Sequence, residues 1–298
     1  MNAAVWLTGC RGMLGTEVGL LLAREGVEIL ATDREVDITD KESLERFASG
    51  KKFGWIVNCA GYTAVDKAED EPEKAFRINA EGPSNLALIA READARLIHI
   101  STDYVFDGRK KGEYLEDDSP NPISVYGRSK LEGDRMIMEK LQQFYIIRTA
   151  WLFGKYGKNF VETMLRLFKE NEEVKVVHDQ WGTPTYAVDL AHIIRTIIKQ
   201  SKNNFGIFNF TNDGVTNWFN YAKEIYSKAR KLLMIHRDVR IIPIMSSQYP
   251  CKAKRPLNSL LSKEKVKTIL GVTVRNWKDA LDDYLNSMDE NHHQYMKI

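Results

Sequence analysis

Short apolar runs and amphipathic stretches alternate along the first half of the chain. The run AAVWLTG (3–9) closes on a glycine, and TEVGLLLAREG (16–26) has the apolar spacing of a helix that stops at a glycine. The alternation continues through a strand at 27–33, a helix at 41–49, a strand at 54–61, a helix at 71–93 and a strand at 95–102. Because parallel strands need crossover connections, these units predict a parallel sheet with helices on both faces.

The pattern changes in the second half of the chain. Two prolines precede a helix that we predict from Ser124 to about Leu141, and a strand follows at 144–154. Beyond Gly154 strands and helices alternate less regularly. The predicted elements there are helices at 159–171, 187–200, 217–233 and 276–288 and strands starting at 173, 206 and 240. The fold class is therefore α/β, a doubly wound parallel (Rossmann) sheet with a smaller α/β C-terminal lobe. We place the first domain at 1–151, with return segments near 180–200, and the second lobe mainly at 152–298.

Composition and charge narrow the classes of function. The 298 residues carry 43 Lys and Arg against 41 Asp and Glu, a balance that gives no electrostatic footprint for nucleic acid. The three cysteines form no C-x-x-C pair, which favours a reducing, cytoplasmic compartment over a disulfide framework or a zinc site. No apolar stretch reaches eighteen residues, so we predict no membrane span and no membrane partner.

A glycine-rich segment follows the first predicted strand directly. TGCRGMLG places Gly9, Gly12 and Gly15 at the junction between that strand and the next helix. Glycine there permits a tight turn and lets the backbone approach a pyrophosphate, while the helix N-terminus supplies amides. A glycine triplet alone is weak evidence, but its place at the first strand-to-helix junction predicts a dinucleotide site.

Charged residues after the second predicted strand bear on the choice of cofactor. Asp33 lies about where an acidic side chain would take the ribose hydroxyls of NAD, whereas Arg34 and Arg11 would hold a 2'-phosphate. Two basic groups beside one carboxylate favour NADPH over NADH, with use of both left open. Asp37 and Ile38 would line the adenine pocket, although Asp37 would equally serve as a helix cap.

Small residues follow the third predicted strand, where Ala60 and Gly61 leave room for a flat ligand. Ligands bind at the carboxyl ends of strands in doubly wound sheets, so we include both residues in the cofactor site. Simple turn chemistry is the alternative explanation for them.

Tyr126 and Lys130 lie four residues apart and share one face of the predicted helix. Tyrosine has a pKa near 10 in peptides, and a neighbouring ammonium favours the phenolate, so this pair can form an acid/base group. Thr102, at the end of a predicted strand, would donate a hydrogen bond to a carbonyl oxygen beside the tyrosine hydroxyl. Alone, Thr102 would be a cap or turn residue, and Y-x-x-x-K often arises by chance; the order of the motifs along the chain supports the catalytic interpretation.

The sequence resembles the extended short-chain dehydrogenase/reductases, and among them the dTDP-4-dehydrorhamnose reductase family. The matching segments follow the family's order nearly to Trp277 and are TGCRGMLG, DREVDITD, NCAGYTAVDKAE, INAEGPSNLA, STDYVFDG, YGRSKLEGD, RTAWLFG, DQWGTPTYAVDLA and RPLNSLLS. The resemblance implies that a nucleotide sugar, dTDP-4-dehydro-L-rhamnose, is reduced at its 4-keto group to dTDP-L-rhamnose. The hydride would come from NADPH or NADH and the proton from Tyr126, with help from Thr102 and Lys130. Tyr126 and Lys130 would also contact the cofactor, with Lys130 on the nicotinamide ribose.

The resemblance also implies contact residues. Those for the cofactor are Gly12, Met13, Leu14, Asp37, Ile38, Gly61, Tyr62 and Thr63. Those for the substrate are Thr102, Asp103, Tyr104, Trp151, Arg255 and Asn258. Without the resemblance, Trp151 would be an edge aromatic and Arg255 part of a surface turn.

The sequence departs from related proteins at two places, and two alternative functions stay open. Some members of the family carry a magnesium-binding glutamate after GTPTYA, where this chain has Val188 and Asp189, so we predict no resident metal and a monomer or weak homodimer. Asp103 and Tyr104 follow the threonine without the glutamate that the related dehydratases use, which disfavours elimination. The alternatives are reduction of another nucleotide-linked 4-keto-6-deoxy sugar, and a non-catalytic, NADP-binding regulatory subunit of methionine adenosyltransferase.

Overall fold

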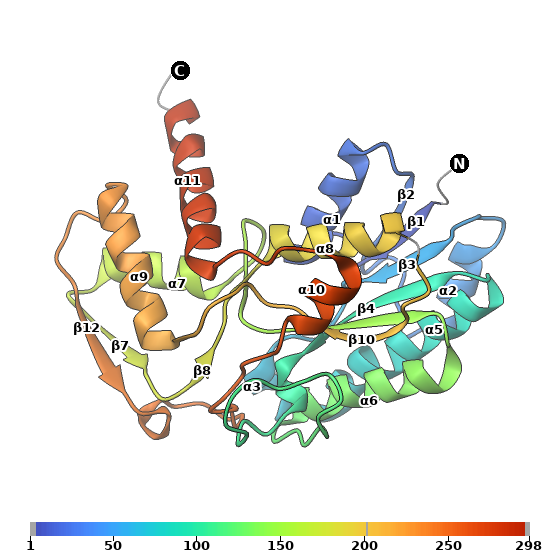
Figure 1. Cartoon of the computed structure of the whole chain (residues 1–298), viewed down its shortest axis with the longest axis horizontal. Coiled ribbons are helices and arrows are strands. Elements are labelled where there is room, and N and C mark those ends of the chain that lie inside the picture. Colours follow the sequence, from blue (N-terminus) through green and yellow to red (C-terminus); the bar gives the residue numbers. More distant parts are fainter. Residues whose placement is uncertain (1–3, 201, 296–298) are drawn as a thin grey trace.

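A six-stranded parallel sheet forms the centre of the larger domain (Figure 1). The computed structural model describes residues 4–200 and 202–295, with side chains up to residue 288. In spatial order the strands are β10 (Gly206–Asn209), β5 (Phe144–Thr149), β4 (Arg96–Thr102), β3 (Trp55–Asn58), β1 (Val5–Thr8) and β2 (Ile29–Thr32). The chain runs from β1 to β2 on one side and then crosses to β3 on the other. This confirms the doubly wound sheet and places its switch point between β1 and β3.

Helices cover both faces of this sheet, as the alternation within β1 requires. Val5 and Leu7 point to one face, which is covered by α1 (Met13–Arg24), α8 (Ala187–Gln200) and α10 (Glu264–Leu270). Trp6 points to the other face, which is covered by α2 (Lys41–Ala48), α5 (Gly82–Glu92) and α6 (Val125–Lys140). Side chains of a strand alternate between faces, so the apolar run of β1 is buried on both sides.

The predicted helices are largely confirmed, with local differences. Ser124 caps α6, because its hydroxyl accepts a hydrogen bond from the backbone N–H of Gly127 at 3.1 Å. The single helix predicted at 71–93 is divided into α4 (Pro72–Phe76), a π-helical turn η1 (Arg77–Glu81) and α5. Asp37 does not cap the following helix, since Asp40 holds that position and accepts from Ser43 N. The one-turn helix α3 (Val65–Ala68) was not predicted.

The smaller lobe lies beside the carboxyl ends of the strands (Figure 1). Its parallel strand pair, β7 (Glu173–Val177) and β12 (Arg240–Ile244), packs with α7 (Phe160–Glu170), α9 (Trp218–Lys231) and α11 (Trp277–Tyr295) around a separate apolar core. The remaining short elements are β6 (Leu152–Phe153), β8 (Trp181–Gly182), β9 (Thr185–Tyr186), β11 (Thr216–Asn217), η2 (Asp103–Val105) and η3 (Ser246–Gln248).

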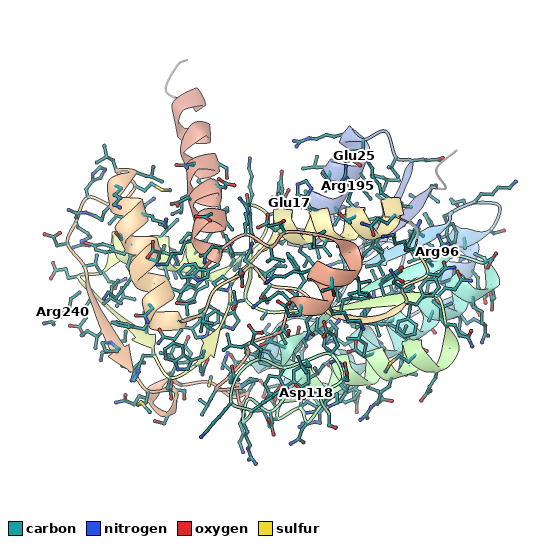
Figure 2. The ribbon with its side chains drawn as sticks, in the orientation of Figure 1. Glu17, Glu25, Arg96, Asp118, Arg195 and Arg240 are labelled. Carbon is teal, nitrogen blue, oxygen red and sulfur yellow. The ribbon has the colours of Figure 1, made fainter. Side chains whose placement is uncertain are left out.

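The chain returns to the sheet domain over a longer stretch than the 180–200 we expected. Helix α8 packs against α1, and β10 then adds the sixth strand beside β5. Glu25, the C-cap of α1, binds Arg195 and Lys199 of α8 at 2.7 and 2.9 Å, and Figure 2 shows Glu25 and Arg195 near each other. The division of the chain near residue 151 stays a prediction.

None of the helices in residues 4–200 and 202–295 combines the length and the apolar composition that a bilayer crossing needs.

Candidate functional site

A cavity of about 900 Å³ opens at the carboxyl ends of β1, β2 and β3. Ten of the predicted cofactor residues line it: Gly9, Arg11, Gly12, Asp33, Arg34, Asp37, Ile38, Ala60, Gly61 and Tyr62. They come from three separate loops, which the doubly wound topology brings to one edge of the sheet.

Two glycines of the turn have no room for a side chain. Gly9 has a φ of +66°, and a Cβ on it would lie 2.6 Å from the backbone nitrogen of Ala60. A Cβ on Gly15 would overlap the carbonyl oxygen of Gly9 and lie 2.9 Å from the Cα of Cys10. A Cβ on Gly12 would come no nearer than 3.3 Å to the rest of the protein, and Gly12 lines the cavity. Gly9 and Gly15 therefore shape the turn, while Gly12 leaves space on the ligand side.

The N-terminus of α1 fits an anionic group. Gly12 is its N-cap, no side chain caps the helix, and its first turn has no acidic residue. The first amides of a helix lack intrahelical partners, and its dipole favours negative charge there. Together with the cavity beside Gly12, this arrangement suits a dinucleotide pyrophosphate.

The charged residues around the cavity are already linked to one another. The Asp33 carboxylate accepts hydrogen bonds from the backbone N–H groups of Arg11 at 3.1 Å and Arg34 at 2.9 Å. The guanidinium of Arg11 lies 3.5 Å from the Glu35 carboxylate, and both side chains are largely exposed. Asp33 thus holds the two arginine-bearing loops together, and both arginines line the cavity.

The cavity has lining residues that the sequence did not suggest, and some predicted cofactor residues lie elsewhere. The cavity is also lined by Val36, Thr39, Cys59, Lys74, Arg77 and Ile78. The last three share one face of α4 and η1, and helical spacing would have been the signal for them. Among the predicted residues, Leu14 is buried in the core, and Met13 would contact a Cβ placed on Gly154 or Gly157 of the smaller lobe. Gly15, Thr63, Tyr126 and Lys130 are also absent from the lining, and cofactor contacts for all six remain predictions.

Thr102 and Tyr126 meet where β4 ends beside the start of α6. The Thr102 hydroxyl donates to Asp103 Oδ1 at 3.0 Å and accepts from the backbone N–H of Tyr104 at 3.2 Å. The rings of Tyr104 and Tyr126 pack edge to face, with centroids 5.5 Å apart. Burial raises the pKa of Asp103 to about 6, against the hydrogen bonds from Ser259 and Thr102.

The electrostatics of Tyr126 and Lys130 differ from the sequence-based expectation. Burial raises the pKa of Tyr126, and the neighbouring Thr102 hydroxyl opposes that shift. Burial also lowers the pKa of Lys130 to about 8. The Lys130 ammonium was expected to make the phenol more acidic, but its Nζ donates to the carbonyl oxygen of Ile100 at 2.6 Å and lies 3.2 Å from His99 Nε2. Tyr126 is therefore held in its protonated form, as a proton donor requires.

Two glycines near Tyr126 and Lys130 allow α6 to lie close to its neighbours. A Cβ on Gly127 would overlap the carbonyl oxygen of Tyr104, and one on Gly133 would overlap that of Asn79 in η1. Asn79 in turn holds the backbone of Tyr62 and donates to the Ser129 hydroxyl at 3.0 Å. The glycines of YGRSKLEGD thus position the helix, a role that the sequence analysis did not assign.

Trp151 joins the two lobes in an unusual backbone conformation. Its φ is +50°, and its indole stacks on that of Trp218 with centroids 3.6 Å apart and an interplanar angle of 16°. A Cβ on Gly182 would lie 2.7 Å from the Trp151 ring, so the ring needs a glycine there. A non-glycine residue in this region is strained and often belongs to a functional site.

Arg255 and Asn258 are both engaged within the chain. The Arg255 guanidinium pairs with Asp66 of α3 at 2.7 Å, which ties the smaller lobe to the sheet domain. The Asn258 amide donates to the carbonyl oxygens of Lys110 and Gly112, both at 2.7 Å. These contacts give both residues a structural role within the chain. Their contact with a nucleotide sugar stays a prediction.

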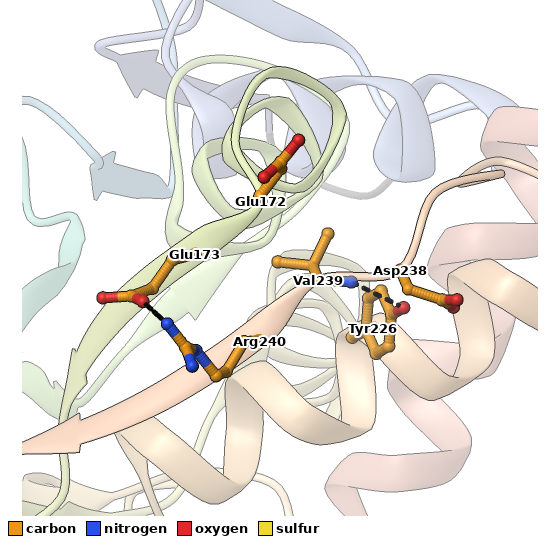
Figure 3. Close-up of a pocket in the computed structure, with 6 residues that line it drawn as sticks. All are labelled: Glu172, Glu173, Tyr226, Asp238, Val239 and Arg240. Atoms are coloured by element: carbon orange, nitrogen blue, oxygen red, sulfur yellow. Dashed lines mark hydrogen bonds and ion pairs between the residues drawn. The ribbon is translucent and has the colours of Figure 1, made fainter.

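A second pocket lies in the smaller lobe between β7, β12 and α9 (Figure 3). Its carboxylates have basic partners: Glu173 pairs with Arg240, Glu172 with Arg237 and Asp238 with Arg230. Within the described residues, no group of three or more His, Cys, Asp or Glu side chains is placed to hold a metal ion. We therefore assign no ligand to this pocket.

A family model and a curated relative each match nearly the whole chain. The family model described as "RmlD substrate binding domain" matches residues 3–290. A dTDP-4-dehydrorhamnose reductase from Aggregatibacter actinomycetemcomitans is 39% identical over 285 residues, which cover 94% of this chain and 97% of that protein.

Two solved structures are similar over nearly the whole chain. A dTDP-4-dehydrorhamnose reductase from Clostridium acetobutylicum has a TM-score of 0.90 and 41% identity, covering 96% of this chain and 99% of that one. The Bacillus anthracis dTDP-4-dehydrorhamnose reductase, solved in complex with NADP, has a TM-score of 0.90 and 36% identity, covering 96% and 100%.

Proposed function

Because the chain belongs to the dTDP-4-dehydrorhamnose reductase family, we propose that it reduces the 4-keto group of dTDP-4-dehydro-L-rhamnose to give dTDP-L-rhamnose. It is an NAD(P)H-dependent oxidoreductase of dTDP-rhamnose synthesis. The observation that carries the proposal is the cavity of about 900 Å³ beside the glycine turn at the switch point of the sheet, in a chain that also has Thr102, Tyr126 and Lys130.

Each catalytic residue has a proposed role. The nicotinamide supplies a hydride when bound. Tyr126 donates its phenolic proton to the C4 oxygen of the sugar, which its raised pKa supports by keeping the phenol protonated. Thr102 orients that oxygen, and Lys130 holds the nicotinamide ribose and returns a proton to Tyr126. The sugar and its nucleotide would contact Thr102, Asp103, Tyr104, Trp151, Arg255 and Asn258.

We further propose that NADPH is the preferred reductant. Arg11 and Arg34 line the cavity at the end of β2, where a 2'-phosphate on the adenosine ribose would lie. Asp33 accepts backbone hydrogen bonds from both of these residues, so its charge is partly committed to the loops. The Arg11 guanidinium also lies 3.5 Å from the Glu35 carboxylate, so Arg34 is the group that most favours a phosphate over a free hydroxyl.

Two further proposals concern the oligomeric state and the cellular location of the protein. A monomer or weak homodimer, without a magnesium bridge, is supported by Asp189, whose carboxylate binds Arg275 Nε at 2.8 Å and Asn212 Nδ2 at 2.6 Å within the chain. A cytoplasmic location is supported by Cys10, Cys59 and Cys251, which are all free thiols.

The test is an assay of cofactor oxidation with the proposed sugar. Purified protein is mixed with dTDP-4-dehydro-L-rhamnose and either NADPH or NADH, and the absorbance of the reduced cofactor is followed. We expect consumption with both and a higher kcat/KM with NADPH. No consumption with either would refute the proposal, and faster turnover of another nucleotide-linked 4-keto-6-deoxy sugar would reassign the substrate.

A further inference from the structure

A chain of buried polar side chains runs behind the catalytic helix, from β1 through β3 and β4 to α6. The Thr8 hydroxyl donates to Asn58 Oδ1 at 2.8 Å, and Asn58 Nδ2 lies 3.0 Å from His99 Nδ1. His99 Nε2 lies 3.2 Å from Lys130 Nζ. Asn58 and His99 are completely buried, and Lys130 is 4% exposed. Neither Asn58 nor His99 is among the proposed catalytic or binding residues.

The backbone fixes the direction of this chain. The N–H of Ala60 donates to Asn58 Oδ1 at 3.1 Å, and a backbone N–H can only donate. The oxygen of the Asn58 amide must therefore face Ala60, and its NH₂ group must face His99. It follows that His99 Nδ1 accepts a hydrogen bond and carries no hydrogen.

The orientation of the Asn58 amide determines whether His99 Nε2, which faces Lys130, carries a hydrogen. A neutral imidazole carries one hydrogen, so with Nδ1 unprotonated the hydrogen is on Nε2, the atom that faces Lys130 Nζ. Burial and the nearby Lys130 charge lower the pKa of His99, which keeps the ring neutral. An Nε2–H group cannot accept from an ammonium, but it can donate to the lone pair of a neutral amine.

We infer that Asn58 and His99 are positioning residues that present an N–H group to Lys130 and thereby stabilise its neutral amine form. The inference rests on the proposed function, in which Tyr126 loses a proton in each turnover. Proton return is balanced as follows: the Lys130 ammonium gives a proton to the Tyr126 phenolate, which leaves an amine and a phenol. The amine then takes up a hydronium proton from the solvent, the one proton that the reduction consumes overall, and His99 stabilises the amine in the interval.

Charged and titratable groups around Lys130 also affect the equilibrium between its ammonium and amine forms. Asp134 of the same helix and the Cys59 thiol favour the ammonium, while burial outweighs them and lowers the pKa of Lys130 to about 8. Asp134 Oδ1 lies 3.9 Å from His99 Nε2, and its Oδ2 accepts from the Ser101 hydroxyl at 2.8 Å. Arg148 of β5 lies behind, its Nε 3.8 Å from Asp134 Oδ2. This second cation partly offsets the Asp134 charge, so Lys130 has no full counterion of its own.

Nuclear magnetic resonance of the ring nitrogens tests the inference without any turnover. In protein labelled with ¹⁵N-histidine, and with the His99 signals assigned by their loss in His99→Gln, we expect a proton on Nε2 and none on Nδ1. The Nε2 signal should also respond to the Lys130 titration, with a midpoint about 2 units below the pKa of lysine in peptides. A proton on Nδ1, or no response between pH 6 and 9, would overturn the inference.

An isosteric variant provides the converse test. In Asn58→Asp the atom facing His99 Nδ1 becomes an acceptor, so we expect the ring hydrogen to move to Nδ1 and the alkaline limb of the turnover profile to shift upward by about 1 unit or more. Asn203→Asp, at an exposed position, adds the same charge away from the site and should change neither the ring nor the profile. A wild-type ring pattern in Asn58→Asp would contradict the assignment.

The two readouts separate the possible failures. If the sugar is not reduced but the wild-type ring carries its proton on Nε2, the proposed function is wrong and the hydrogen-bond chain stands. If the sugar is reduced but the proton is on Nδ1, the inference about Asn58 and His99 is wrong and the proposed function stands.

Discussion

Replacing Gly15 with alanine tests whether the turn between β1 and α1 is shaped by close contact. The added Cβ would overlap the carbonyl oxygen of Gly9 and lie 2.9 Å from the Cα of Cys10. Carbon atoms in contact normally lie about 3.5 to 4.0 Å apart, so the turn must move by more than half an ångström. Gly9 O cannot move freely, because it accepts a hydrogen bond from the Gly12 N–H at 3.1 Å.

The cost of this movement can be bounded. Overpacking of a tight site costs about 1–3 kcal/mol. If the strain falls on the conformation that binds the cofactor, the Kd for NADPH should rise by about 5-fold to 150-fold. Isothermal titration of NADPH into Gly15→Ala measures this directly, and thermal unfolding reports any part of the strain that falls on the whole domain.

Gly19, one turn further along α1, is the matched control. A Cβ there would meet only Leu7 Cδ2, at an ordinary distance of 3.4 Å. Gly19→Ala should therefore bind NADPH as the wild type does, and its helix propensity should stabilise the protein by up to about 1 kcal/mol. If Gly15→Ala binds NADPH with wild-type affinity and melts at the wild-type temperature, the account of the turn is wrong.

Three further substitutions test separate parts of the account. Tyr126→Phe should lower kcat by about 100-fold or more, the scale of general acid catalysis, with the Kd for NADPH unchanged; wild-type turnover would mean that the proton has another source. Arg34→Ala should weaken NADPH binding by about tenfold or more while NADH binding stays constant, because a charge-assisted hydrogen bond contributes about 1.5 kcal/mol or more; equal losses for both cofactors would refute a contact with the 2'-phosphate. Glu25 has a pKa of about 2, held there first by its hydrogen bonds from Arg195 and Lys199. Because this value is below that of an unfolded chain, the stability from Glu25 is present above about pH 4.3 and is lost as pH falls toward 2. In urea unfolding between pH 5 and 2.5, Glu25→Gln should therefore lose less stability than the wild type, and an identical pH dependence would contradict this.

Local patterns of apolar and polar residues predict most of the fold. The strands from β1 to β5 and helices α1, α2, α6, α7 and α8 coincide with predicted segments, because each has a clear apolar pattern. Helices α1, α2, α6 and α7 also have a cap or a glycine stop. Two-residue strands such as β6 and β9 have no such period, since their pairing depends on the return of residues 185–186 to the strand after Trp151. Tertiary contact alone determines them.

The cofactor side of the site was more predictable than the catalytic side. Gly9, Gly12 and Asp33 lie in loops that follow strands directly, so topology places them at the cavity. The surroundings of Lys130 could not be predicted in the same way, because His99 and Asn58 come from two other strands and have no local signal. The sequence suggested an ammonium that acidifies Tyr126, whereas the structure buries Lys130, partly buries Tyr126 and turns Lys130 toward His99 and Ile100.

The transfer of deuterium from NADPH to the sugar tests the central claim most directly. The protein is given NADPH with deuterium in both positions at the reactive carbon of the nicotinamide, together with dTDP-4-dehydro-L-rhamnose, and the product is examined by proton magnetic resonance and mass spectrometry. We predict one deuterium at C4 of dTDP-L-rhamnose and a loss of about 100-fold or more in its rate of formation in Tyr126→Phe. A sugar recovered without deuterium, or labelled equally fast by the variant, would contradict the account.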